Sequence, residues 1–170
     1  MNGKKIVVFG CDNAGKTTLC NALAHEFKED GFKVEIAKSI GANKSVEQYM
    51  DFMKDNLSKK YTVIFDRFPI IEEATCGKVL RENDLFFQKW MNNEVLDILK
   101  QVDCFVFCYP GLMNVLNWGN REQMEGVKDN ILQLINAYNE MVVTLLKLGL
   151  NVVEFNYSRD ATTVIYRRVK

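Results

Sequence analysis

The chain has 170 residues, of which 48% are hydrophobic and 26% charged, and only two are prolines. This composition excludes disordered and fibrous proteins. It predicts one globular domain over residues 1–170, which would bury about two-thirds of the surface of its unfolded chain. Lysine plus arginine equals aspartate plus glutamate at 22 each. The zero net charge gives no overall field that would draw the protein onto nucleic acid or an anionic membrane.

The cysteines and the N-terminal segment indicate the compartment. There are five cysteines, without a CxxC pair, and a single histidine, His25. An odd number of thiols without a metal-binding pattern predicts free cysteines in a reducing, intracellular setting, which we take to be the cytoplasm. The apolar run before residue 10 is too short for a signal peptide or a membrane span, so no membrane partner is expected.

Five short apolar runs predict β-strands, and they alternate with helical patterns. The strands are expected at residues 5–9, 33–37, 61–66, 103–109 and 151–155. Apolar residues at helical spacing predict helices at 16–30, 46–57, 70–80, 84–100 and 122–148. Residues 160–170 fit a terminal helix and an added edge strand equally well. The alternation predicts an α/β fold of three layers, with a five-stranded parallel sheet and helices on both faces.

The stretch GCDNAGKTT begins at Gly10 and joins the first strand to the first helix. Gly10, Gly15, Lys16 and Thr17 match G-x-x-x-x-G-K-[ST] in the strand-to-helix context that this phosphate-binding motif requires. Glycines let the backbone wrap closely around phosphate, and the amides of residues 13–18 and the helix N-terminus attract it. Lys16 would neutralise the β- and γ-phosphate oxygens, and Thr17 would hold Mg²⁺. The sequence therefore predicts binding of a nucleoside triphosphate with Mg²⁺.

Other classes of phosphate-loop protein fit less well. A GTPase would carry an NKxD base reader and a DxxG switch, and neither stands in the right context; motors and transporters need longer chains. A small phosphotransferase remains. The stretch VIFDRFP, residues 63–69, supports this class, because Asp66 at the tip of a buried strand is where a Mg²⁺ ligand or an acceptor base belongs. Arg67 beside it can bind a phosphate through two N–H groups.

With these motifs in place, the whole chain resembles a P-loop nucleoside monophosphate kinase of the thymidylate kinase-like branch, which includes compact virus-encoded deoxynucleotide kinases. DRFPIIEEATCG, residues 66–77, is similar to the family's DR-aromatic segment and the small helix that lines its acceptor pocket. GNREQMEGVKDN, residues 119–130, falls where the family has an arginine-bearing lid, expected here at about 111–126. The resemblance implies a P-loop NTPase fold with a short lid, ATP and Mg²⁺ as cofactors, and helix-packed homodimers.

The resemblance also implies residue roles. The catalytic residues would be Lys16, Asp66, Arg67 and Arg121, with Arg67 holding donor and acceptor phosphates together and Arg121 closing from the lid. Thr17 and Asp66 would place Mg²⁺ and its water. The ATP contacts would be Gly10, Asp12, Asn13, Ala14, Gly15, Lys16, Thr17, Thr18 and Arg159, the last over the adenine ring. Phe68 would wall the acceptor base pocket, with Glu72, Glu73 and Arg81 at its rim.

The chain departs from thymidylate kinases around the acceptor. Their Arg-Glu-Pro stretch after the second strand is replaced by AKSIGANKS, residues 37–45, which offers only Lys38 and Lys44. Ala74-Thr75-Cys76 stands where the family often has Tyr-Gln after a small residue, and the lid segment carries one arginine. These differences bear on which acceptor is used and not on the fold.

The leading hypothesis is therefore transfer of the γ-phosphate of ATP to a deoxynucleoside monophosphate, with a dTMP-like pyrimidine favoured. Two alternatives remain open. One is a kinase that acts on nucleic acid, at a DNA end or at the hydroxyl of a modified base such as hydroxymethyluracil, although the zero net charge opposes it. The other is a deoxynucleoside kinase with Asp66 as the base. A nucleotide-binding protein without turnover is disfavoured, because Lys16, Thr17, Asp66 and Arg67 are all present.

Overall fold

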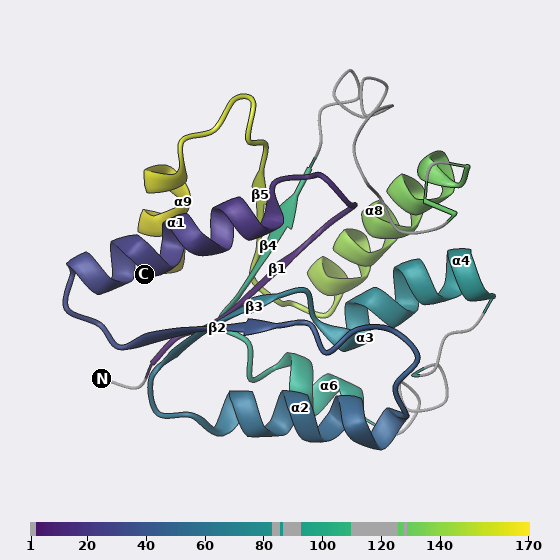
Figure 1. The fold of residues 1–170 in the computed structure, drawn as a ribbon, viewed down its shortest axis with the longest axis horizontal. Helices are drawn as coiled ribbons and strands as arrows, with labels where there is room; N and C mark the ends of the chain where they lie inside the picture. Colours follow the sequence, from purple (N-terminus) through teal and green to yellow (C-terminus); the bar gives the residue numbers. More distant parts are fainter. Residues whose placement is uncertain (1–2, 83–85, 87–92, 110–125, 128) are drawn as a thin grey trace.

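The central feature of this computed structural model is a five-stranded sheet. The structure describes residues 3–82, 86, 93–109, 126–127 and 129–170. The strands are β1 (Lys5–Phe9), β2 (Val34–Lys38), β3 (Thr62–Asp66), β4 (Cys104–Cys108) and β5 (Val152–Phe155). All neighbouring pairs are parallel, and the order is β2-β3-β1-β4-β5. The predicted parallel sheet is confirmed, and Figure 1 shows it between two layers of helices.

The three inner strands are buried along their whole length. Strands covered on both faces have continuous apolar sequences rather than alternating ones, which is why these runs could be recognised from the sequence. The register pairs Val8 of β1 with Asp66 of β3. Because β1 and β3 are parallel, the end of β3 therefore lies beside the loop that follows β1.

Helices surround the sheet on both sides. They are α1 (Lys16–Glu29), α2 (Val46–Ser58), α3 (Pro69–Glu72), the π-helical turn η1 (Glu73–Gly77), α4 (Lys78–Arg81), α6 (Glu94–Leu99), α8 (Ile131–Lys147) and α9 (Thr162–Val169). In Figure 1, α1 and α9 lie on one face, and α2, α3, α6 and α8 on the other. Most of the segment 160–170, for which the sequence fitted a helix and an edge strand equally well, forms the helix α9.

The core has two parts, one on each face of the sheet. Alternate residues of β1 serve the two parts: Val7 and Phe9 pack toward α2 and α8, whereas Ile6 and Val8 pack toward α1 and α9. Each strand therefore stabilises both helical layers, and a strand residue that changed face would disturb both parts of the core.

Local signals explain where the helices begin and end. Ser45 caps α2 in a capping box with Gln48, in which each side chain bonds to the other residue's backbone N–H. Gly31 follows α1 at φ +81°, a left-handed conformation that glycine adopts without strain. Its N–H donates to the carbonyl of Lys28 at 2.9 Å, which ends the helix.

Within the described residues, two helices begin later than the sequence predicted. The helix predicted at 84–100 is interrupted, because Asn93 has a φ of +59° and α6 begins only after it. The helix predicted at 122–148 begins at Ile131, because residues 126–127 and 129–130 form turns and Gly126 has a φ of +79°. In both cases the apolar spacing continues through a residue whose backbone leaves the helical region.

The expected lid, residues 111–126, lies outside the described residues except for Gly126. Among the helices that are described, none combines the length and the apolar character needed to cross a membrane. The single domain over 1–170 and the homodimer stay predictions.

Gly10 is a position where both the backbone conformation and the neighbouring strand oppose a side chain. It has a φ of +141°, and a Cβ built there would lie 2.4 Å from the carbonyl oxygen of Cys108 in β4. We expect Gly10→Ala to lower the free energy of unfolding by at least about 2 kcal/mol, because strain and overpacking add. Urea denaturation measures it. Gly149→Ala is the matched control: φ is +73°, nothing lies within 4 Å, and the expected loss is only about 1 kcal/mol. Equal losses in the two variants would contradict the contact with β4.

Candidate active site

The loop from Gly10 to Thr17 joins β1 to α1 at the carboxyl edge of the sheet. Gly15 stands immediately before α1 at φ +81°, and a Cβ on it would meet the ring of Tyr157 at 3.4 Å. The segment after β5 therefore lies against the loop. In open parallel sheets, ligands bind at the carboxyl ends of the strands, at the point where the order of the strands reverses direction.

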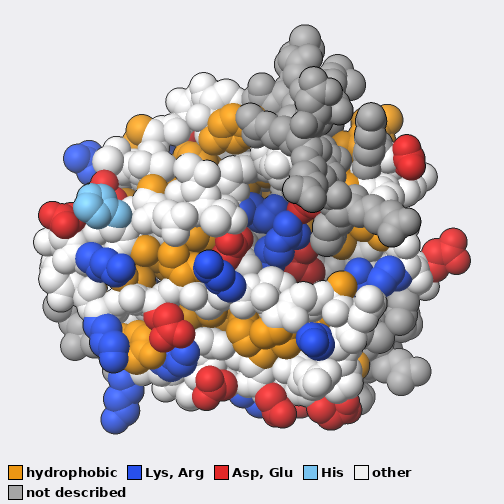
Figure 2. Space-filling model, in the orientation of Figure 1, with side chains coloured by type: hydrophobic (Ala, Val, Ile, Leu, Met, Phe, Trp, Pro, Cys, Tyr) orange, Lys and Arg blue, Asp and Glu red, His pale blue; other side chains and the backbone are white. Residues whose placement is uncertain are grey.

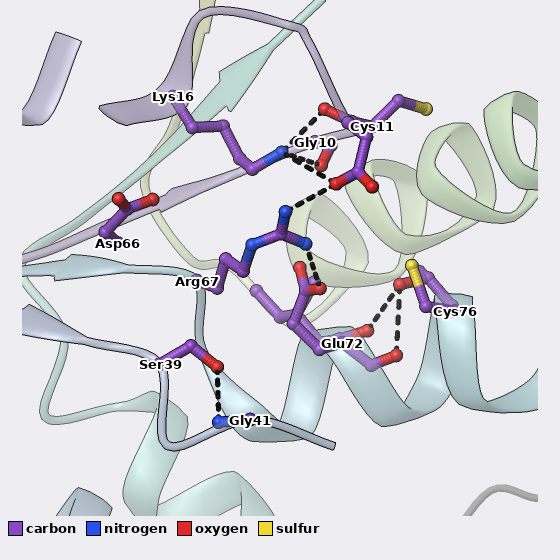
Figure 3. Close-up of polar contacts among 12 residues, drawn as sticks. Gly10, Cys11, Lys16, Ser39, Gly41, Asp66, Arg67, Glu72 and Cys76 are labelled. Atoms are coloured by element: carbon purple, nitrogen blue, oxygen red, sulfur yellow. Dashed lines mark hydrogen bonds and ion pairs between the residues drawn. The ribbon is translucent and has the colours of Figure 1, made fainter. Parts of the chain in front are cut away.

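Lys16 points into the loop that precedes it. Its ammonium group donates to the carbonyl oxygens of Gly10 at 2.8 Å and Cys11 at 2.6 Å, and lies 3.9 Å from Oδ1 of Asp12. The residue is only 5% exposed. Figure 3 shows its Nζ held between these loop groups. A buried positive charge is thus placed at the centre of the phosphate loop.

Asp66 and Thr17 form a second polar pair at the same edge. The Thr17 hydroxyl donates to Oδ2 of Asp66 at 2.7 Å. The other oxygen, Oδ1, is buried without a hydrogen-bond partner in the part of the chain that the structure describes. An unpartnered buried carboxylate oxygen calls for a cation or a water. The pair fits Mg²⁺, which binds one or two protein oxygens together with water and substrate phosphates. No cluster of three or more His, Cys, Asp or Glu ligands occurs among the described residues.

Asn13 supplies an unused donor on the same loop. Its φ is +59°, and its side-chain Nδ2 is buried without a hydrogen-bond acceptor among the residues described. A buried donor that faces no acceptor is costly unless a ligand oxygen satisfies it. Together with the ammonium group of Lys16, Asn13 makes the loop complementary to a phosphate group.

Arg67 connects this loop to the helix that follows β3. One arm of its guanidinium pairs with Oδ1 of Asp12, and the other donates to Oε2 of Glu72 at 3.0 Å. Figure 3 shows Arg67 lying between Lys16 and Glu72. Burial opposes its charge, but Glu72 and Asp12 outweigh burial and raise the pKa of Arg67 above its ordinary value. Its φ of +77° is strained for a residue with a side chain, as is common at functional sites.

A cavity of about 240 Å³ opens on the far side of Arg67 from the loop. Its walls come from the segment after β2, from α2 and from the helical segment 69–81; the lining residues are Ser39, Gly41, Ala42, Tyr49, Arg67, Pro69, Glu72, Glu73, Cys76 and Arg81. Figure 2 shows positive and negative side chains side by side near the centre of this face. Among the described lining residues, two arginines and two glutamates have formal charges that cancel.

Two hydrogen-bonded clusters hold the acids of the cavity. Glu72 accepts a hydrogen bond from Tyr138 of α8 at 3.1 Å, and the same hydroxyl lies 3.3 Å from the sulfur of Cys76. Glu73 is bound by Arg81 at 2.6 Å and by Tyr49 at 3.1 Å. Burial, followed by the charge of Glu72, raises the pKa of the Tyr138 hydroxyl, which therefore stays protonated as a donor.

The remaining predicted residues lie in different places. Phe68 is fully buried in the core, with its ring 5.0 Å from that of Phe65, and it is not in the cavity wall where it was expected. Thr18 is exposed and Ala14 is buried in the loop. Arg159 is exposed and paired with Asp160. Arg121 lies outside the described residues.

Two solved structures are similar to this chain in fold. The YorR protein from Bacillus subtilis, in complex with phosphorylated GDP, gives a TM-score of 0.73 at 16% identity, over 98% of this chain and 93% of that one. Thymidylate kinase from Ehrlichia chaffeensis gives 0.61 at 15%, over 99% and 97%. This chain has a P-loop kinase fold. No protein-family model matches the sequence, and neither does any curated protein.

Sequence reasoning missed four aromatic or sulfur side chains of this P-loop kinase fold. Tyr49 and Tyr138 had the helical spacing of core residues and both are buried, but each also donates a hydrogen bond to an acid of the cavity. Cys76 is buried too, and its sulfur contacts the Tyr138 hydroxyl. Tyr157 lies against Gly15 and is two residues before Arg159, which the resemblance places over the adenine ring. A buried tyrosine on an apolar helix face needs a hydrogen-bond partner, and this is the signal that could have identified Tyr49 and Tyr138.

Loss of the Arg67 side-chain charge should destabilise the fold. We expect Arg67→Met to lower the free energy of unfolding by about 1 to 3 kcal/mol, because Asp12 and Glu72 would lose a shared partner at a site that is mostly buried. Chemical denaturation measures the loss. Arg159→Met removes an exposed ion pair and should leave the denaturation midpoint unchanged. If the Arg67 variant were as stable as the unsubstituted protein, the three-residue contact would not hold the loop to the helix.

Proposed function

We propose that the protein is an ATP-dependent phosphotransferase that acts on a deoxynucleoside monophosphate. The observation that carries this proposal is the position of Arg67, which contacts Asp12 in the phosphate loop and at the same time lines the acceptor cavity. A single cation between two binding sites is suited to hold the γ-phosphate of a donor and the phosphate of an acceptor close together.

The donor side is the phosphate loop together with the first residues of α1, residues 10–18. Its backbone amides, among them those of Asp12, Asn13, Ala14 and Gly15, would surround the ATP phosphates. Lys16 would balance the charge of the transferring group. The ring of Tyr157 against Gly15 suggests where the adenine lies, with Arg159 on the same segment. Thr17 and Asp66 would hold Mg²⁺, which supplies positive charge to the phosphates when it is bound.

On the acceptor side, Arg67 and the residues Glu72, Glu73 and Arg81 surround the cavity. In the reaction, an acceptor phosphate oxygen forms a bond to the γ-phosphorus and the bond to the bridging β-phosphate oxygen breaks, which leaves ADP. The protein contributes positioning and electrostatic stabilisation rather than covalent chemistry, and the fixed, paired charges of Arg67 and Lys16 suit that role. Arg121 stays a predicted lid residue that adds to this charge.

The neighbours in fold support a nucleotide acceptor. The YorR structure contains phosphorylated GDP, and the other neighbour is named for thymidylate. At 15 to 16% identity this support extends to the class of substrate and not to the base. The thymidylate kinase-like resemblance favours a dTMP-like pyrimidine, whereas the YorR structure contains a guanine nucleotide.

A deoxynucleoside is the second candidate acceptor. The observation that favours it is the neutral charge of the cavity lining, since a monophosphate with two negative charges would prefer a net positive site. Lys38, at the end of β2, is the nearest substitute for the arginine that the related enzymes carry there. A nucleic acid acceptor is less well supported, because the cavity is small and is not part of a basic channel among the described residues.

The free cysteines support a location in a reducing compartment. All five are unpaired and buried, and burial raises the pKa of Cys11 and Cys108 to about 12 and that of Cys76 to about 11. Such thiols stay protonated and unreactive near neutral pH. We therefore propose a cytoplasmic protein.

Transfer from ATP should depend on Lys16 and Asp66. We expect Lys16→Ala and Asp66→Asn each to lower kcat by at least about 100-fold, because each removes a charge that acts on the phosphates. Radiolabel transfer from ATP with Mg²⁺ measures this against deoxynucleoside monophosphates, deoxynucleosides and single- and double-stranded DNA. Lys28→Ala, an exposed lysine on the same helix, is the control and should keep full activity.

The acceptor that receives the label decides between the candidates. Transfer to a monophosphate supports the leading proposal, and transfer only to a deoxynucleoside or only to DNA replaces it with the corresponding alternative. Tight ATP binding without transfer to any acceptor would contradict a kinase function.

A further inference from the structure

Glu73 is the most buried acid of the cavity and has no role in the phosphate chemistry proposed above. The residue is 3% exposed, yet it lines the cavity. Its Oε1 accepts both the bond from Arg81, at 2.6 Å, and the bond from Tyr49, at 3.1 Å. A buried carboxylate thus lines the cavity beside a guanidinium that is 29% exposed.

This pair is poorly explained by stability alone. Burying an ion pair costs about as much solvation free energy as the attraction returns, and apolar residues of similar volume would often stabilise a fold more. The helix is also distorted at this point. The π-helical turn η1 begins at Glu73, and the Thr75 hydroxyl bonds to the Ile71 carbonyl at 2.7 Å. Such single π turns occur frequently at functional sites.

The hydrogen-bond capacity of the cluster is not used up. The Tyr49 hydroxyl has one proton and faces two acceptors, the Gly41 carbonyl at 3.0 Å and Glu73. Burial, followed by the charge of Glu73, contributes to a raised pKa of Tyr49, so this proton stays in place. Within the described part of the chain, both bonds to Glu73 end on Oε1, which leaves Oε2 for a ligand donor. Arg81 has five N–H groups, and its bond to Glu73 uses one.

We propose that Glu73 and Arg81 read the base of the acceptor and select bases that carry an exocyclic amino group. This inference rests on the proposed function, because it takes the cavity as the acceptor site. The amino groups of cytosine, adenine and guanine donate to a carboxylate. Each of these bases also has a ring nitrogen beside the amino group that accepts a hydrogen bond from an arginine. The cluster offers the matching acceptor and donor side by side.

Thymine and uracil fit this cluster less well. In the register in which cytosine donates its amino group to Glu73 and accepts from Arg81 at N3, thymine and uracil would place a carbonyl oxygen against the carboxylate and an N–H against the guanidinium, so both hydrogen bonds would be lost. Two acceptors in contact, one of them charged and removed from water, repel each other, so the wrong base is rejected as well as the right one bound. The acceptor is thus an amino-bearing nucleotide rather than the dTMP-like pyrimidine that the resemblance favours.

Matched pairs of nucleotides test this selection. dCMP has an amino group and an acceptor nitrogen where dUMP has a carbonyl oxygen and an N–H. dAMP differs from dIMP in the same way, and dGMP has an amino group where dIMP has a hydrogen. For the base that fits the cavity, we expect the amino-bearing member to have a kcat/KM at least about tenfold higher than its partner. Calorimetric binding of each nucleotide without ATP gives the same comparison independently of turnover.

The variant Glu73→Gln exchanges the charged acceptor for an amide that can also donate. We expect it to reduce the preference for dCMP over dUMP, or for the favoured purine over dIMP, by at least about tenfold. Glu72→Gln is the matched control, because Glu72 lines the same cavity but binds Arg67 and Tyr138. It should lower the rates for both members of a pair together and leave their ratio unchanged.

The outcomes separate this inference from the proposed function. Phosphorylation of monophosphates without a preference for amino-bearing bases, or an unchanged ratio in Glu73→Gln, overturns the inference and leaves the kinase function standing. Binding with the expected preference but without transfer overturns the function and leaves base selection standing. If no monophosphate binds, both are overturned.

Discussion

The structure depends on the ion pairs of Arg67. Its guanidinium is mostly buried between Asp12 in the phosphate loop and Glu72 in the helical segment after β3, and Glu72 is in turn bound by Tyr138 of α8. These contacts join three elements that are distant in the sequence, and each charge is compensated by a neighbour of opposite sign. Breaking one contact would leave a buried charge unpaired, which costs far more than the intact pair contributes. The loop and the acceptor cavity are therefore held in one fixed relation.

That fixed relation is what a phosphotransferase requires. Transfer between two phosphates gains most from holding the reacting groups in line and from charges that are already oriented, because the protein then does not have to reorganise during the reaction. Among the residues that the structure describes, two buried side-chain atoms have no hydrogen-bond partner, namely Oδ1 of Asp66 and Nδ2 of Asn13. The strained backbone at Arg67 belongs to the same pattern, in which local stability is lower where a ligand binds.

The fold and the loop could be predicted from local signals, whereas the cavity could not. The inner strands were readable because burial on both faces makes their sequences continuously apolar, and the loop because its glycines and Lys16 stand at fixed spacing in a strand-to-helix context. Tyr49 and Tyr138 contact acids that are 24 and 66 residues away in the chain. Their hydroxyl groups on apolar helix faces indicate that a hydrogen-bond partner is needed, but the local sequence does not indicate which residue it is. Phe68 was placed in the cavity wall by resemblance, but the turn at Arg67 directs its ring toward Phe65. Asn93 and Gly126 interrupt two segments for which the apolar spacing predicted a continuous helix.

The central claim is that donor and acceptor occupy neighbouring sites bridged by Arg67. The most direct test is calorimetric binding of a joined ligand, in which adenosine and the preferred deoxynucleoside are linked through five phosphates. If both sites are filled at once, this ligand should bind at least about 100-fold more tightly than ATP or the monophosphate alone, because the second contact becomes intramolecular. Binding no tighter than that of ATP would contradict the claim, since it would mean that only the phosphate loop is occupied.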